Sequence, residues 1–192
     1  MKKKRIYILM GHTDPATLSG ALADCYEEHA RGAGHEVRRQ NIGEMHFDPI
    51  LHEGYKAVQQ LEPALIDFQE NVRWAEHIVI IYPTWWHTMP AMLKGLFDRA
   101  WLPHYAFNFA DHGLTWRKLL KGRTAHIVTS ANTSPWAIRF MYGPPTMEMN
   151  LVLLRFAGIR ARSTVLGPSE RASARTKAKW FRRVARAGQR GK

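Results

Sequence analysis

Short apolar runs alternate with longer amphipathic segments along the whole chain. Five segments have the apolar or β-branched character of strands, and they fall near residues 4–10, 36–42, 77–82, 123–130 and 159–166. Five others have apolar residues at helical spacing, and they fall near residues 17–32, 62–75, 90–101, 146–157 and 170–187. Strands that alternate with helices are typical of βαβ units around a parallel sheet. The pattern therefore predicts an α/β protein.

Charge on the predicted strands indicates their order in the sheet. The first, third and fourth strands are near-continuous apolar runs, as expected where helices cover both faces of a sheet. The second strand carries Arg38 and Arg39 and the fifth carries Arg160 and Arg162, which suits sheet edges. This arrangement predicts a flavodoxin-like three-layer α/β/α fold with a five-stranded parallel sheet of order 2-1-3-4-5. A ligand would then lie beyond the carboxyl ends of the first, third and fourth strands.

The loop after the first strand, residues 11–19, runs directly into a helix. A helix N-terminus offers unpaired backbone N–H groups and a partial positive charge. Thr17 and Ser19 add hydroxyl groups and His12 adds an imidazole, so a phosphate group would fit here. The loop lacks both the GxGxxG fingerprint and the GxxxxGK(S/T) motif of P-loop proteins. The alternative is that Thr17 only caps the helix and His12 lies on the surface.

The loop after the third strand, Tyr82–Pro90, contains two adjacent tryptophans, Trp85 and Trp86. Large aromatic side chains are costly to leave exposed, and a loop at this point of the sheet can present them to a flat ring system. The alternative is that both indoles simply cover the core.

At these residues the chain resembles the NAD(P)H-dependent quinone oxidoreductases of the flavodoxin-like superfamily, the NAD(P)H dehydrogenase (quinone) or flavodoxin-2 type. The similar segments agree in order and spacing and cover nearly the whole chain. They are residues 12–21, 47–50, 83–90, 93–99 and 156–159. The resemblance implies one flavodoxin-like flavin-binding domain over residues 1–192, and the length alone gives little reason to expect two.

The resemblance also implies a set of flavin-binding residues. Those of the first loop would contact the phosphate side of the flavin, and those of the loop after the third strand would line its ring. The expected cofactor-binding residues are His12, Thr17, Leu18, Ser19, Pro83, Thr84, Trp85, Trp86, His87, Ser130, Ala131 and Asn132.

The loop after the fourth strand departs from the Thr-Thr-Gly-Gly of many relatives and reads Ser-Ala-Asn-Thr-Ser-Pro-Trp. Trp136 or Tyr142 would flank the ring or the substrate, and we expect Tyr142 and His87 to be catalytic. In family dimers an aromatic segment closes the pocket of the partner subunit, which adds Phe107 and Phe109 to the expected substrate pocket.

The implied activity is an NAD(P)H-dependent reduction of a quinone or similar small acceptor. The expected cofactor is FMN, with FAD as the close alternative, and NAD(P)H is the expected electron donor. Both substrates would use one pocket in turn, which is a ping-pong mechanism, and the family implies a homodimer. A one-electron carrier is less favoured because such flavodoxins are usually acidic, whereas this chain carries a formal charge of +12.

The positive charge concentrates at the two ends of the chain, with no acidic residue after Glu170. The C-terminal segment has Ala178, Phe181 and Val184 at helical spacing. This pattern predicts a surface helix that packs one apolar stripe against the protein and exposes its other residues to solvent. The alternative function is that of a regulatory flavoprotein subunit of a membrane potassium-efflux system, as in some relatives, with the basic C-terminal tail in peripheral contact with a membrane or an acidic partner. We expect no nucleic-acid binding because the basic residues are not part of a recognisable nucleic-acid-binding module.

Other classes of function lack their motifs. The histidines have no zinc-ligand spacing and no partner cysteines, so no metal is expected. No GxSxG elbow or pair of carboxylates indicates hydrolysis. No apolar run is long enough to span a membrane, and Cys25 is the only cysteine, so a cytoplasmic protein is expected.

Overall fold

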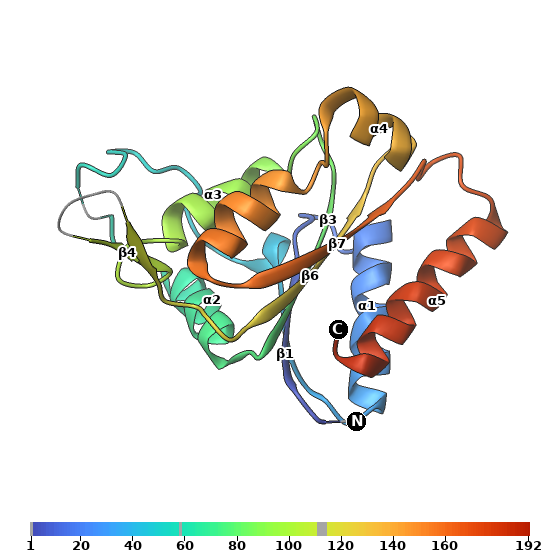
Figure 1. Ribbon diagram of the computed structural model, residues 1–192, viewed down its shortest axis with the longest axis horizontal. Coiled ribbons are helices and arrows are strands. Elements are labelled where there is room, and N and C mark those ends of the chain that lie inside the picture. Colours follow the sequence, from blue (N-terminus) through green and yellow to red (C-terminus); the bar gives the residue numbers. More distant parts are fainter. Residues whose placement is uncertain (1, 58, 111–114) are drawn as a thin grey trace.

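A parallel sheet forms the centre of the computed structural model, which describes residues 2–57, 59–110 and 115–192. Its strand order is β2-β1-β3-β6-β7 (Figure 1). The strands are β1 (Arg5–Met10), β2 (Glu36–Asn41), β3 (His77–Pro83), β6 (Thr124–Ser130) and β7 (Arg160–Leu166). Counted without the short hairpin β4/β5, this is the predicted order 2-1-3-4-5, which is confirmed.

Burial along the strands follows the predicted division into central and edge strands. Strands β1, β3 and β6 are buried along almost their whole length. The edge strands expose the charged side chains of Arg38, Arg160 and Arg162. A central strand has helices on both faces, whereas an edge strand leaves side chains and backbone groups at the solvent.

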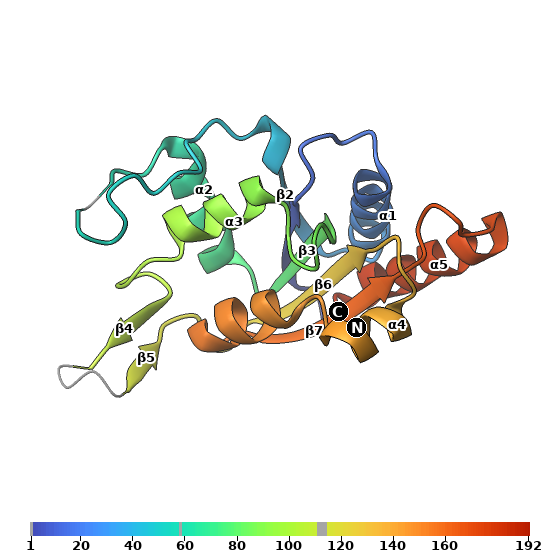
Figure 2. The same ribbon diagram turned by 90° about the horizontal axis from the view of Figure 1, so that it is seen from above.

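Helices cover both faces of the sheet, so the predicted three layers are confirmed (Figures 1 and 2). One face packs against α1 (Leu18–Gly32) and α5 (Ala174–Arg190). The other packs against α2 (Pro63–Trp74), α3 (Ala91–Ala100) and the π-helix η2 (Glu148–Arg155).

Three further elements were not predicted. They are the short helix η1 (Ile42–Glu44), a hairpin of β4 (Phe107–Phe109) and β5 (Trp116–Lys118), and helix α4 (Pro135–Tyr142). Ser134 precedes α4, Pro135 begins it and Gly143 ends it with a positive φ. Proline at the first helical position and glycine after the last are helix boundary signals, so the sequence did mark α4.

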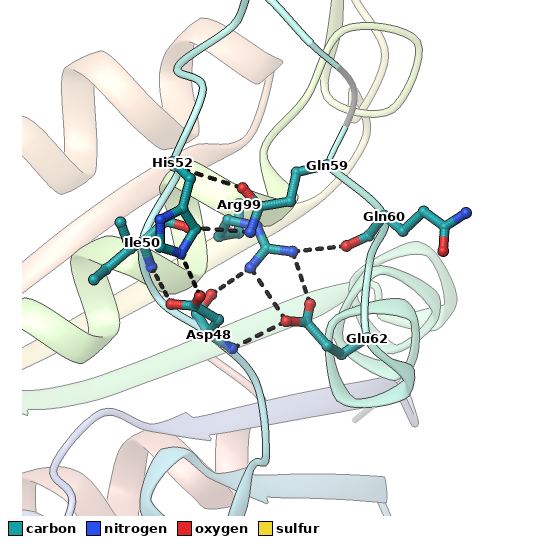
Figure 3. Close-up of polar contacts among 7 residues, drawn as sticks. All are labelled: Asp48, Ile50, His52, Gln59, Gln60, Glu62 and Arg99. Atoms are coloured by element: carbon teal, nitrogen blue, oxygen red, sulfur yellow. Dashed lines mark hydrogen bonds and ion pairs between the residues drawn. The ribbon is translucent and has the colours of Figure 1, made fainter.

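A buried arginine fixes the long segment between β2 and α2 on helix α3 (Figure 3). Arg99 is only 1% exposed. It pairs with the Glu62 carboxylate at 2.8 Å and donates to the carbonyl oxygens of Gln60, at 2.7 Å, and of Asp48. A Cβ on Gly95 would lie 2.4 Å from the Cβ of Pro49, so only glycine lets the segment approach α3 this closely. Residues 47–50 and 93–99, two of the segments that carry the family resemblance, therefore pack against each other.

Candidate functional site

Three loops meet at the carboxyl edge of the sheet. They follow β1, β3 and β6, and backbone hydrogen bonds continue the ladder of the sheet into them. The N–H of Gly11 donates to Ile81 at 2.7 Å, that of Thr84 to Ser130 at 2.7 Å, and that of Ala131 to Leu166 at 2.8 Å. Because the strands are parallel, segments far apart in the sequence begin their loops side by side.

The loop after β1 is closed by its own polar groups and leaves the start of α1 open. Thr17 donates its hydroxyl to the Asp14 carbonyl at 3.0 Å, and His12 Nδ1 accepts from the Asp14 amide at 2.8 Å. Thr17 is the N-cap residue, yet its side chain makes no capping hydrogen bond to the helix. The first N–H groups of α1 therefore keep the anion-binding capacity of an uncapped helix N-terminus.

Two glycines let this loop approach its neighbours closely. A Cβ on Gly20 would lie 1.9 Å from the Pro15 carbonyl oxygen, and one on Gly43 would lie 1.9 Å from that of Thr13. Any larger residue at either place would push the loop out of position. The backbone of the loop is therefore fixed from both sides.

A tight turn follows β3 and carries the second tryptophan of the pair into solvent. Trp85 and Thr88 exchange two backbone hydrogen bonds of 3.0 Å, and the residues between them have φ of 48° at Trp86 and 68° at His87. Left-handed backbone is uncommon for bulky residues and is maintained only where the surroundings impose it. The Trp86 side chain is 100% exposed, so the alternative that both indoles cover the core is wrong.

Hydroxyl contacts hold both ends of this turn. The hydroxyls of Thr84 and Thr129 lie 2.8 Å apart, and the Thr88 hydroxyl donates to Glu148 Oε2 at 2.6 Å. The amides of Thr84 and Trp85 are engaged in backbone hydrogen bonds, but the described residues offer no acceptor to the amides of Trp86 and His87. The turn therefore presents two free N–H groups.

A cavity of about 500 Å³ lies between this turn and helix α4. His87 and Tyr142 face each other across part of it, with ring centroids 5.5 Å apart. Its volume falls within the range of about 300–1,000 Å³ typical of small-molecule sites. Its lining residues are Thr84, Trp86, His87, Ala131, Asn132, Thr133, Ile138 and Tyr142.

Six of the predicted site residues line this cavity, namely Thr84, Trp86, His87, Ala131, Asn132 and Tyr142. His12 contacts Trp85 edge to face, with ring centroids 5.3 Å apart, which joins the loop after β1 to the turn. Ser19 and Ser130 are almost fully buried, whereas Trp136 is exposed on α4. Thr17, Leu18 and Pro83 are half-buried, and none of them lines the cavity.

Phe107 and Phe109 lie elsewhere in the chain. They lie on β4 and line a separate apolar cavity of about 460 Å³, together with Trp101, Leu153 and Phe156. A single subunit therefore does not bring them to the cavity between the turn and α4.

Three residues at the site were not predicted from the sequence, namely Thr133, Ile138 and Glu148. Ile138 is buried on α4, and recognising that helix from Ser134-Pro135 would have located it. Glu148 lies 60 residues from its partner Thr88, and no local pattern indicates such a contact. The amide oxygen of Asn132 accepts from the Glu170 amide at 3.1 Å, which fixes the loop after β6.

Among the described residues, no group of three or more histidine, cysteine, aspartate or glutamate side chains is placed to hold a metal ion. None of the helices described in this chain has both the length and the apolarity needed to cross a membrane.

The residues of the site fit a flavin nucleotide. The open N-terminus of α1 suits its phosphate, and the cavity with the exposed Trp86 suits an aromatic ring. The two free amides of the turn suit a ring that gains negative charge on reduction.

The chain is similar to known families and sequences. A family model described as "Flavodoxin-like fold" (Flavodoxin_2) matches residues 4–188. The chain is 27% identical over 128 residues to the ribosyldihydronicotinamide dehydrogenase-like protein traD of Penicillium crustosum, covering 56% of this chain and 48% of that protein. It is 26% identical over 163 residues to human ribosyldihydronicotinamide dehydrogenase [quinone], covering 70% of each. The match spans about half the length of the first of these curated relatives.

Solved structures show the same fold. The NAD(P)H:quinone oxidoreductase of Methanothermobacter marburgensis superposes with a TM-score of 0.82 at 23% identity, and the match covers 100% of both chains. An FMN-dependent NADH-azoreductase of Bacillus anthracis, solved with FMN, gives a TM-score of 0.68 at 15% identity over 97% of this chain and 98% of that one.

Proposed function

Because the chain belongs to the flavodoxin-2 family of flavodoxin-like proteins, we propose that it is a flavin-dependent NAD(P)H oxidoreductase that reduces a quinone or similar small acceptor. The observation that carries the proposal is the cavity of about 500 Å³ beside the strained, fully exposed Trp86. An exposed indole held by left-handed backbone is costly unless a ligand covers it.

The proposed cofactor is FMN, as in the azoreductase solved with FMN, and NAD(P)H is the proposed donor. A bound flavin supplies two-electron transfer from NAD(P)H to the acceptor in two half-reactions that share one pocket. The uncapped N-terminus of α1, with Thr17 and Leu18, would hold the phosphate. Trp86 would pack on the ring and exclude water from one side of it.

The chain's own donors would stabilise charge on the bound ring. The free amides of Trp86 and His87 are fixed before binding, so they need no reorganisation to donate. The His87 imidazole and the Tyr142 hydroxyl both reach the cavity and would donate hydrogen bonds to a reducible oxygen of the acceptor. Thr88 and Glu148 would keep His87 in place because they anchor the end of its turn.

A homodimer would complete the substrate pocket. Phe109 is exposed, and the apolar cavity that it lines with Phe107 is open to solvent in one subunit. Large apolar surface of this kind marks an interface. In a dimer these aromatic side chains would close the pocket of the partner subunit over the acceptor.

The placement of the ring is tested by the change Trp86→Ala. We expect the variant to lose at least tenfold in affinity for FMN, because the largest apolar contact of the ring is removed. Fluorescence titration of the apoprotein with FMN measures this affinity.

A matched control is Phe140→Ala, which removes an exposed aromatic residue of α4 that does not line the cavity. This control should bind FMN as the unmodified protein does. Unchanged affinity in Trp86→Ala, or equal losses in both variants, would refute the proposed position of the ring.

A further inference from the structure

Helix α5 packs along α1 (Figures 1 and 2). Its basic side chains line a cavity beside the edge strand β7. Val184, Ala187 and Gly188 are the buried residues of the helix. A Cβ on Gly188 would lie 2.5 Å from the Tyr26 carbonyl oxygen, so the two helices touch closely at this glycine. This packing sets the rotation of α5 and therefore the direction of its arginines.

This cavity beside β7 has a volume of about 430 Å³. Seven of its nine lining residues are arginine or lysine, and none is acidic. Its arginines are Arg162, Arg182, Arg183, Arg186 and Arg190. Among the ion pairs of the described residues, none involves any of these five side chains.

Hydrogen bonds through the buried His126 fix the side chain of Arg162 at this cavity. Arg162 donates to His126 Nδ1 at 3.3 Å, so the neutral imidazole carries its hydrogen on Nε2 and donates it to the Thr164 hydroxyl at 2.9 Å. Burial, followed by the charges of Arg162 and Arg183, lowers the pKa of His126 to about 3, so the ring is neutral at physiological pH. Burial and Arg183 also lower the pKa of Arg162 itself, although Tyr26 acts in the opposite direction.

A second cavity of about 400 Å³ continues from the first toward the amino edge of the sheet. It shares Arg162 and Lys192 with the first, and His77 lines it. His77 is almost fully buried, and its Nε2 has no hydrogen-bond partner among the described residues, whereas its Nδ1 lies 2.7 Å from the Thr124 hydroxyl. A buried polar atom without a partner at a cavity wall indicates a ligand or water contact.

We propose that the cavity between α5 and β7 binds a compact anion with two or more linked phosphate groups. Guanidinium groups match phosphate oxygens in pairs, and five of them line this cavity with no acidic side chain among its lining residues. Such a cluster destabilises the folded chain through like-charge repulsion, and an anion would relieve this repulsion. A concave site encloses a small polyanion better than a flat site would.

This site is separate from the flavin site. His126 lies on β6 and Ala131 follows the end of that strand five residues later, so these two lining residues are roughly 16 Å apart along the strand direction. The anion would therefore bind without displacing FMN or NAD(P)H. Its phosphates come either from a free polyphosphate compound or from a phosphorylated lipid headgroup.

Calorimetric titration of the full chain with sodium tripolyphosphate tests the proposal, with sodium sulfate at equal ionic strength as the comparison. Tripolyphosphate should bind at one site, at least tenfold more tightly than sulfate. The double change Arg183→Gln and Arg186→Gln should weaken this binding at least tenfold. The matched control, Arg175→Gln with Lys177→Gln, removes equal charge from exposed positions of α5 that do not line the cavity and should retain the affinity.

Vesicle sedimentation separates the two sources of phosphate. Vesicles with phosphatidylinositol 4,5-bisphosphate are compared with phosphatidylserine vesicles of equal surface charge. If the protein sediments only with the phosphatidylinositol 4,5-bisphosphate vesicles, and the Arg183 and Arg186 variant does not, the ligand is a lipid headgroup. If the protein binds tripolyphosphate but sediments with neither kind of vesicle, the ligand is a free anion. Equal weakening in both double variants would overturn the proposal, as would binding of duplex DNA or an acidic peptide without binding of tripolyphosphate. Unchanged circular dichroism and flavin reduction in the variants confirm that fold and redox site are intact.

Discussion

At the scale of single residues, the turn after β3 has an unusual backbone for its side chains. Trp86 and His87 both have positive φ, at 48° and 68°, although neither is glycine. Such conformations cost on the order of 1–3 kcal/mol each and cluster at functional sites. The neighbouring residues Thr84 and Thr88 supply the contacts that keep the turn in this form.

The change His87→Gly should therefore separate stability from activity. Glycine relieves the left-handed strain but adds chain entropy, so the free energy of unfolding should stay equal or rise by up to about 1 kcal/mol. Acceptor reduction should slow, because an imidazole donor in the cavity is lost. Urea denaturation and steady-state kinetics measure the two effects.

His104 provides the matched control because its φ is 66° and it lies outside the cavity. The change His104→Gly should have the same effect on stability and leave acceptor reduction unchanged. If it slowed the reaction as much as His87→Gly, the role assigned to His87 would be wrong.

At the scale of elements, an ion pair fastens the segment between β2 and α2 to α3. Burial opposes ionisation of Glu62, but hydrogen bonds from the Asp48 amide and from Arg99 outweigh it and lower the pKa of the carboxyl below its ordinary value of 4.5. A lowered folded-state pKa stabilises the protein above the ordinary pKa. That stabilisation is lost as the pH falls through the lowered value.

The change Glu62→Gln should lower the free energy of unfolding at pH 7 by about 2 kcal/mol, because the buried Arg99 loses its charged partner. It should also flatten the decline of stability as the pH falls below the ordinary carboxyl pKa of 4.5. Urea denaturation at several pH values measures both effects. Glu53→Gln, a change at an exposed position of the same segment, should alter neither, and an equal change in both variants would show that Glu62 has no special role.

The elements themselves were predictable where burial is periodic or continuous. The five strands and their order followed from apolar central runs and charged edges, such as Arg38 and Arg160. The hairpin was not predicted because its strands have only three residues each. It also depends on a tertiary contact, the stacking of Trp116 on Phe156, whose ring centroids are 4.4 Å apart. The meeting of the three loops was predictable because the strands are parallel. The contact between Thr88 and Glu148 was not predictable from the sequence, because it depends on how the fold places distant residues together.

At the scale of the whole molecule, the formal charge of +12 is concentrated rather than spread. The predicted C-terminal surface helix formed as α5, and Phe181 and Val184 pack inward as expected, but Ala178 is exposed. The stripe instead continues to Ala187 and Gly188. Other positions of α5 place arginines at the cavity beside β7, away from the proposed flavin site.

We propose that the three loops at the carboxyl edge bind a flavin that NAD(P)H reduces. The direct measurement is an anaerobic absorption spectrum of the purified chain with FMN or FAD, followed by NADPH or NADH and then menadione. We predict that FMN binds, that its absorption bleaches with one of the two nicotinamides, and that menadione restores it. A folded chain that binds neither flavin would contradict this proposal, as would a bound flavin that no nicotinamide reduces.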